Sequence, residues 1–147
     1  MNKYRTHNCS ELTETDINKE VSLSGWLHRK RDHGNLLFID LRDHFGITQC
    51  VIENDNKIFT ILEKIKSESV LKISGKVLKR APGTENKDLK TGKIEIIIKS
   101  LEVLSSAKEL PVPVFGEQDY PEELRLKYRF LDLRRDEMHK NIILRSK

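Results

Sequence analysis

Basic and aromatic residues gather in one stretch of the sequence where two strands are expected to form a hairpin. Arg29 and Arg31 end the first strand, and Phe38 lies in the second, where apolar–polar alternation turns its ring away from the core. Proteins that bind single-stranded nucleic acid combine cationic side chains along the phosphates with aromatic faces on which bases stack. The pattern therefore favours nucleic-acid binding. The structural alternatives are a Phe38 packed under a neighbouring loop or helix and arginines that are simply solvated at a strand end.

Two polar residues in later predicted strands could read the edge of a base. The side-chain amide of Gln49 carries both an acceptor and a donor. The carboxylate of Glu95 lies in an apolar strand and could accept from the N1/N2 edge of guanine. The polar segment from Arg80 to Gly92 joins the last two predicted strands, where OB-folds grip oligonucleotides. Ordinary surface positions on a strand and a flexible solvent loop are the alternatives.

Residues arranged for catalysis or metal binding are not apparent. The sequence contains no P-loop, no G-x-S-x-G, no H-E-x-x-H and no glycine-rich dinucleotide turn. Its five histidines lack the spacing of metal ligands. Asp40 and Asp43 are a pair of carboxylates, but Arg31 and Arg42 lie close by in sequence, so we interpret both acids as salt-bridged structural residues. We expect no catalytic residue, no metal site and no cofactor in this chain.

Composition and charge are those of a mildly basic protein in water. The chain has 147 residues, 34% of them charged, and 27 Lys and Arg against 23 Asp and Glu give a net charge of +4. No run approaches the roughly 18 consecutive apolar residues of a membrane span, and the first residues lack the apolar part of a secretion signal. Cys9 and Cys50 are too few for a disulfide framework. We expect a cytoplasmic protein with reduced thiols.

Hydrophobic periodicity predicts a mainly β domain. A bend or bulge is expected at Gly75 and a one-residue slip near Lys99. Alternation indicates five strands, at residues 21–29, 36–42, 47–52, 70–79 and 94–103.

A helix is expected between the third and fourth strands. Asn54 or Asp55 could cap its start. Its predicted apolar face consists of Ile58, Ile61, Leu62 and Ile65. Three strands, a helix and two strands is the order of the OB-fold, a five-stranded Greek-key barrel. An open α+β sheet is the structural alternative.

The chain is expected to divide into three parts. The OB-fold domain takes residues 1–106, and residues 107–121, which hold three of the four prolines, form a hinge or linker. Residues 122–147 contain no Gly or Pro and are predicted to form short helices. The last helical pattern runs to Lys147 without a stop signal, which predicts that the chain is a fragment.

Three segments resemble bacterial aspartyl-tRNA synthetases, in the right order and over nearly the whole chain. They are GWLHRKRDHGNLLFIDLRD at 25–43, TGKIE at 91–95 and RLKYRFLDLRR at 125–135. The resemblance implies the N-terminal, anticodon-binding part of a class II ligase that activates aspartate with ATP and Mg²⁺ and charges tRNA. Members of that family are homodimers. Their catalytic domain would follow Lys147 and would hold the ATP and Mg²⁺.

The resemblance also implies a role for individual residues. Phe38 matches the ring that stacks on an anticodon base, and Gln49 matches the residue that reads the central uracil. Arg31 matches a basic residue that contacts the anticodon, and Glu95 matches the carboxylate associated with the first base, a guanine or its modified form. We add Arg29 and Arg80 to this expected anticodon site on the basis of their charge and position.

Two further positions bear on the choice of tRNA. The combination of His33 and Gly83 resembles the relaxed form of the family, which accepts tRNA(Asn) as well as tRNA(Asp). The two anticodons differ only at the third base, which is C in one and U in the other. Relaxed charging would imply an amidotransferase that converts Asp-tRNA(Asn). The structural alternative is that His33 is a turn residue and that Gly83 supplies a positive φ after Pro82.

Two other classes of protein remain open. One is a stand-alone OB protein that binds single-stranded nucleic acid. The other is an interaction module whose Phe38 face docks on protein, for which binding would be insensitive to salt.

Overall fold

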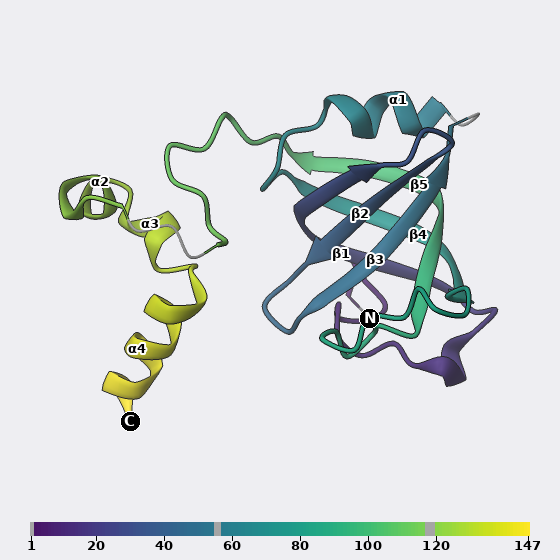
Figure 1. The fold of residues 1–147 in the computed structure, drawn as a ribbon, viewed down its shortest axis with the longest axis horizontal. Helices are drawn as coiled ribbons and strands as arrows, with labels where there is room; N and C mark the ends of the chain where they lie inside the picture. Colours follow the sequence, from purple (N-terminus) through teal and green to yellow (C-terminus); the bar gives the residue numbers. More distant parts are fainter. Residues whose placement is uncertain (1, 55–56, 117–119) are drawn as a thin grey trace. The chain divides into compact units, whose positions relative to one another are not determined.

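The computed structural model describes residues 2–54, 57–116 and 120–147. These residues form two compact units that divide between Lys108 and Glu109 (Figure 1). No helix within the described ranges combines the length and the apolar character that crossing a membrane requires. Asp55, one of the two expected helix caps, lies outside the described residues.

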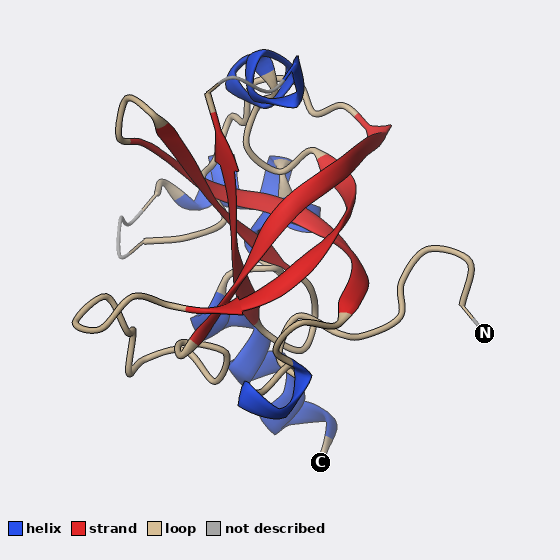
Figure 2. Cartoon of the chain, turned by 90° about the vertical axis from the view of Figure 1, so that its right-hand side faces the viewer, coloured by secondary structure: helices blue, strands red, loops and turns tan. Residues whose placement is uncertain are grey.

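The first unit is a closed five-stranded barrel, as predicted. Its sheet runs in the order β1-β2-β3-β5-β4, and β1 pairs with β4 to close it (Figure 2). All neighbours are antiparallel except β3 and β5, which are parallel. The strands are β1 (Glu20–Asp32), β2 (Leu36–Arg42), β3 (Ile47–Glu53), β4 (Val70–Lys79) and β5 (Ile94–Ser105).

The core of the barrel is built by strand alternation, with one contribution that the sequence analysis missed. Inward-facing residues such as Leu23, Ile39 and Ile73 are fully buried. Cys9 and Leu12, from the segment before β1, are buried with them, next to a short 3₁₀ turn η1 (Glu14–Asp16). Two hydrogen bonds hold this segment at Cys9. The amide of Cys9 donates to a carboxylate oxygen of Asp43 at 2.9 Å, and its carbonyl accepts from the hydroxyl of Thr48 at 2.7 Å.

The helix α1 (Lys57–Lys64) lies across one end of the barrel (Figure 1). Its position between β3 and β4 confirms the prediction, but its buried face is rotated. Phe59 and Leu62 are buried, whereas Ile61, expected on the apolar face, is 50% exposed. Burying the larger aromatic ring removes more apolar surface from water than burying Ile61 would, and this difference accounts for the rotation.

A β-bulge in β1 decides which way the basic residues of this strand point. Leu27 pairs with Leu41, but the next pair is Arg29 with Asp40, so His28 is an extra residue. From this point the alternation of β1 is reversed. Arg29 and Arg31 therefore leave the core side.

The same bulge turns Lys30 toward α1. Its ammonium group donates to the carbonyl oxygens of Glu63 at 2.8 Å and Ile65 at 2.7 Å, and more weakly to Leu62 at 3.3 Å. The carbonyls of Leu62 and Glu63 belong to the last turn of α1, and that of Ile65 directly follows the helix. A cation at this end satisfies groups that the helix itself leaves open. Lys30 is thus a helix cap, whereas its two neighbours in sequence are surface cations.

The slip predicted near Lys99 is a second bulge, opposite Gly75. Ser74 pairs with Ser100 and Gly75 with Ile98, which leaves Lys99 as the extra residue. A Cβ on Gly75 would lie 2.1 Å from the carbonyl oxygen of Ile97. The strands can therefore approach at this bulge only because residue 75 has no side chain.

The second unit contains buried apolar residues and a buried carboxylate that pairs with arginine side chains. Val112, Val114 and Leu131 are buried. The fully buried carboxylate of Asp132 accepts from Arg125 at 3.1 Å and from Arg129 at 3.4 Å, and Arg135 lies 3.8 Å away. The helices of this unit are α2 (Glu122–Lys127), α3 (Arg129–Asp132) and α4 (Asp136–Ser146).

Gly75→Ala should lower the free energy of unfolding by about 2–3 kcal/mol, because the added methyl group meets the backbone of β5 at Ile97. Gly34→Asn is the control. Position 34 has a positive φ, of 79°, but no atom lies within 4 Å of a Cβ there, and Asn tolerates this conformation. Urea unfolding followed by circular dichroism measures both; equal losses would contradict the close-contact explanation.

Lys30→Met should lower the free energy of unfolding by about 1–2 kcal/mol, since the last carbonyls of α1 lose a charged donor. Lys72→Met is the matched control, because Lys72 pairs with Glu102 only at 3.7 Å on the surface and such pairs contribute about 0–1 kcal/mol. Hydrogen exchange of the α1 amides checks the location of the effect. Unchanged protection in α1 would show that Lys30 does not cap it.

Candidate nucleic-acid interface

The outward face of β2, β3 and β5 presents two adjacent rows of side chains. Asp40 is the direct partner of Gln49, and the parallel pairing of Cys50 with Ile96 sets Gln49 beside Glu95. This is the polar row. The neighbouring apolar row consists of Phe38, Val51 and Ile97, which are partners across the same strands.

Hydrogen bonds join the polar row to Arg31 from β1. The Nη1 and Nη2 atoms of Arg31 donate to the two carboxylate oxygens of Asp40 at 3.0 and 2.8 Å. Nη2 also donates to Oε1 of Gln49 at 3.1 Å, and Nε2 of Gln49 donates to Oε2 of Glu95 at 2.9 Å. Four neighbouring strands thus contribute one residue each to a continuous chain, which we call the Asp40–Glu95 network.

Asp40 and Gln49 of the network are largely shielded from solvent. Asp40 is 6% exposed and Gln49 is 9% exposed, whereas the side chain of Arg31 is 42% exposed. Fork-to-fork pairing of a guanidinium with a carboxylate is both strong and geometrically specific. The prediction that Asp40 is salt-bridged is confirmed. Its partner Arg31 also donates to Gln49, a residue of the expected site, and this second contact was not predicted.

Arg80 is buried at the edge of the same region. It is 4% exposed, its Nε donates to the carbonyl of Ile94 at 3.0 Å, and its Nη1 donates to the carbonyl of Thr84 at 3.3 Å. Burial lowers the pKa of its guanidinium, while the carboxylates of Glu95 and Asp40 act in the opposite direction. Its Nη2 has no hydrogen-bond partner within the described part of the chain. A buried donor left in this state costs free energy that an acceptor on a ligand would recover.

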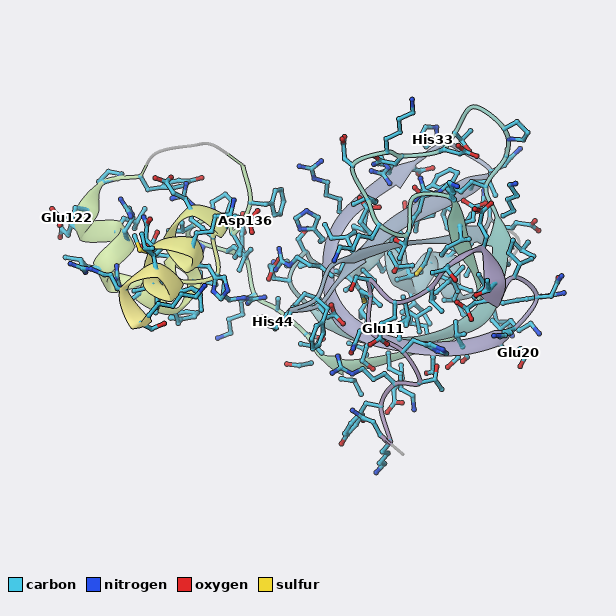
Figure 3. All side chains as sticks on the ribbon, turned by 90° about the horizontal axis from the view of Figure 1, so that it is seen from below. Glu11, Glu20, His33, His44, Glu122 and Asp136 are labelled. Carbon is cyan, nitrogen blue, oxygen red and sulfur yellow. The ribbon has the colours of Figure 1, made fainter. Side chains whose placement is uncertain are left out.

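The aromatic ring of Phe38 is half-buried and lies at the border between the sheet face and a turn. His33 contacts it edge to face, with 5.2 Å between ring centroids. The turn is closed by the amide of His33, which donates to the carbonyl of Leu36 at 2.9 Å. His33 and His44 lie well apart in Figure 3, one before β2 and one after it.

Gly83 lies in the tight turn that follows Arg80. Its φ is +84°, and the amide of Thr84 donates to the carbonyl of Ala81 at 3.0 Å across the turn. A Cβ at this position would meet no atom within 4 Å. The positive φ after Pro82 is therefore observed, and the space around Gly83 is open.

The basic residues of the first hairpin have different surroundings. Arg29 is exposed. Arg42, at the end of β2, is held by Glu68 through two hydrogen bonds of 2.8 and 2.9 Å. Asp43 pairs with Arg5 at 3.3 Å rather than with Arg42. Arg29 and Arg31 lie on the outward face, where Arg31 is paired with Asp40, and Arg42 is paired in the same way with Glu68.

Part of this site could have been found from the sequence. The short connection between the strands predicted at 36–42 and 47–52 fixes the register of the second hairpin, which makes Asp40 and Gln49 direct partners. The bond from Gln49 to Glu95 spans 46 residues and a parallel strand pair, for which local sequence carries no signal. The local sequence also gives no indication of the β-bulge at His28.

Thiol and metal chemistry do not add to the site. Burial raises the pKa of the Cys9 and Cys50 thiols, so neither is poised as a nucleophile. Among the described residues, no group of three or more His, Cys, Asp and Glu side chains is arranged to hold a metal ion.

Comparison with known proteins gives a family match and several relatives. The model of the family described as "OB-fold nucleic acid binding domain" matches residues 21–104. The aspartate–tRNA(Asp/Asn) ligase of Pelagibacter ubique is 65% identical over 147 residues, which is all of this chain and 25% of the relative. The corresponding ligase of Bradyrhizobium sp. is 59% identical over 146 residues. The chain therefore spans about a quarter of the length of the curated relatives it matches.

Solved structures show the same fold. The asparaginyl-tRNA synthetase from Pyrococcus horikoshii complexed with asparaginyl-adenylate superposes with a TM-score of 0.72 and 30% identity, over 87% of this chain and 28% of the other. The aspartyl-tRNA synthetase from Entamoeba histolytica superposes with a TM-score of 0.76 over 86% of this chain and 32% of the other. At 22% identity, the second comparison is used for the fold alone.

Proposed function

The chain belongs to the family of OB-fold nucleic acid binding domains, and on this premise we propose that it binds the anticodon of tRNA(Asp). We assign this binding to residues 1–106, with residues 107–121 as a hinge and residues 122–147 as the start of the domain that follows. The proposal rests on the outward face of β2, β3 and β5, where the Asp40–Glu95 network lies beside the ring of Phe38.

Each expected contact has a physical basis in this face. Phe38 offers a ring on which an anticodon base stacks. Gln49 reads the central uracil through its amide. Glu95 uses Oε2 to hold Gln49 and offers Oε1 to the N1/N2 edge of the first base, a guanine. Arg31 has five N–H groups, of which three are used in the network, so two remain for phosphate.

Two arginines complete the proposed site. Arg29 is exposed on the same strand as Arg31 and contributes positive charge toward the RNA backbone. The Nη2 atom of Arg80 is the buried donor without a partner described above, and an RNA oxygen is a suitable acceptor for it.

The parent enzyme of this chain is proposed to be a class II ligase that attaches L-aspartate to tRNA with ATP, by analogy with the named relatives. The described residues form no metal-binding cluster, and they do not fit a site for ATP and Mg²⁺. We therefore assign those cofactors to the catalytic domain and derive no catalytic step from this chain. A homodimeric enzyme that works in the cytoplasm is part of the same proposal.

Relaxed specificity is proposed for the third anticodon base. His33 and Gly83 both lie in turns rather than strands, and neither a small glycine nor an imidazole imposes a contact that would penalise U relative to C. The ligase would then charge tRNA(Asn) with aspartate as well, and an amidotransferase would have to convert the product. The relatives from Pelagibacter ubique and Bradyrhizobium sp. carry names that include both tRNAs.

A fluorescence titration with three anticodon stem-loops tests this function. We expect similar affinity for the tRNA(Asp) and tRNA(Asn) loops and clear rejection of a loop with an unrelated anticodon, because the first two share the bases that Gln49 and Glu95 contact. Preference for the tRNA(Asp) loop alone would contradict relaxed specificity. Equal binding of all three loops would indicate a general single-strand-binding protein.

Phe38→Ala should weaken binding of the tRNA(Asp) loop by the value of one stacked base, about 1–3 kcal/mol, which is about 5- to 150-fold in Kd. Phe38→Tyr is the control, since it keeps the ring. Wild-type affinity should also fall steeply as salt rises, because cationic contacts release counterions from the RNA. Unchanged affinity in Phe38→Ala would remove this ring from the site, and salt-independent binding would favour a protein partner.

A further inference from the structure

We propose that Asp40 is a positioning residue for base reading. Through Arg31 it fixes the orientation of the Gln49 amide, and this fixed orientation allows Gln49 to accept uracil and reject cytosine. The inference rests on the proposed function, because it concerns how the base opposite Gln49 is distinguished. It adds a role for Asp40, a residue that the sequence analysis interpreted as structural.

The orientation of the Gln49 amide follows from the chemistry of its two partners. A guanidinium can only donate hydrogen bonds and an ionised carboxylate can only accept them. The atom next to Arg31 must therefore be the oxygen, at 3.1 Å, and the atom next to Glu95 must be the nitrogen, at 2.9 Å. Reversing the amide would set donor against donor on one side and acceptor against acceptor on the other.

A fixed amide distinguishes the two pyrimidines. After its bonds to Arg31 and Glu95, Gln49 keeps one lone pair on Oε1 and one N–H on Nε2. Uracil presents a donor at N3 and an acceptor at O4, whereas cytosine presents an acceptor at N3 and a donor at N4. For a base held in one placement by its stack and its sugar, one amide orientation pairs with uracil and the reversed orientation pairs with cytosine.

Asp40 is the residue that makes this orientation persistent. Arg31 is 42% exposed, and an exposed arginine on its own moves among many rotamers at little cost. Asp40 is 6% exposed, and a carboxylate so buried needs a charged partner. The two bonds between the groups, at 2.8 and 3.0 Å, fix the plane of the guanidinium and with it the N–H that points at Gln49.

The chain offers a matched control for removing such a pair. Glu68 accepts two hydrogen bonds from Arg42 at 2.8 and 2.9 Å and is also 6% exposed. Asp40→Asn and Glu68→Gln each replace a buried carboxylate that holds an arginine by an amide of the same shape. Only the first of these pairs is bonded to Gln49.

The experiment compares two stem-loops that differ only in the central anticodon base, U or C, and measures the ratio of their Kd values by fluorescence titration. For the wild-type chain we expect a ratio of about 10–100 in favour of U, as for one well-placed two-bond contact. Asp40→Asn should lower the ratio by at least about threefold, because a mobile Arg31 leaves only Glu95 to hold the amide, so that the reversed amide is populated more often and the C loop binds more tightly. Glu68→Gln should keep the wild-type ratio.

Two additional variants separate the role of Asp40 from that of Gln49 itself. Gln49→Ala should abolish the ratio altogether, and it reports on the reading residue itself. Arg31→Lys keeps the charge but cannot bond two groups as a fork, so it should also lower the ratio and serves if Asp40→Asn does not fold. A wild-type ratio in folded Asp40→Asn or Arg31→Lys, with Gln49→Ala lacking discrimination, would overturn this inference and leave the proposed function intact. Failure of the wild-type chain to bind either loop would overturn the proposed function and the inference with it.

Discussion

A single extra residue in β1, His28, determines which side chains of this strand reach the surface. Without the bulge, strict alternation would continue from the buried Leu27 and turn Arg31 toward the interior. With it, Arg31 reaches Asp40 on the outward face and Lys30 reaches the carbonyls that end α1. The bulge thus links the closure of one end of the barrel to the construction of the binding face. A change that removed it would disturb both at once.

The face proposed to bind RNA is already ordered by hydrogen bonds within the described chain. Burying the carboxylate of Asp40 is unfavourable unless its charge is compensated, and Arg31 compensates it through two hydrogen bonds. Because this cost is met during folding, the side chains do not have to be ordered again on binding, which improves affinity and specificity together. Arg80 differs, since one of its buried donors is unpaired within the described chain. The face therefore combines a satisfied network with one donor that a ligand would complete.

Alternation and turn position predicted the five strands, the slip at Lys99 and the outward direction of Phe38. They failed where a distant contact decides the outcome. Ile61 fits the helical period of the predicted apolar face, yet it is exposed and Phe59 is buried against the barrel instead. Arg42 lies next to Asp43 in sequence but pairs with Glu68, which is 26 residues away. The structure connects three of the candidate site residues, Arg31, Gln49 and Glu95, through hydrogen bonds. This connection depends on a strand pairing that no local pattern encodes.

Strands and turns carry different parts of the proposed specificity. A substitution at Gln49 breaks bonds to residues of β1 and β5, so a change at the residue proposed to read the central base also disturbs the sheet. Gly83 has open space around it, and a change there costs little beyond its positive φ. His33 is intermediate, because its ring rests against Phe38. In the proposed function, the central base, which both anticodons share, would be read by the rigid part of the fold. The third base would face turns that can be altered without rebuilding the barrel.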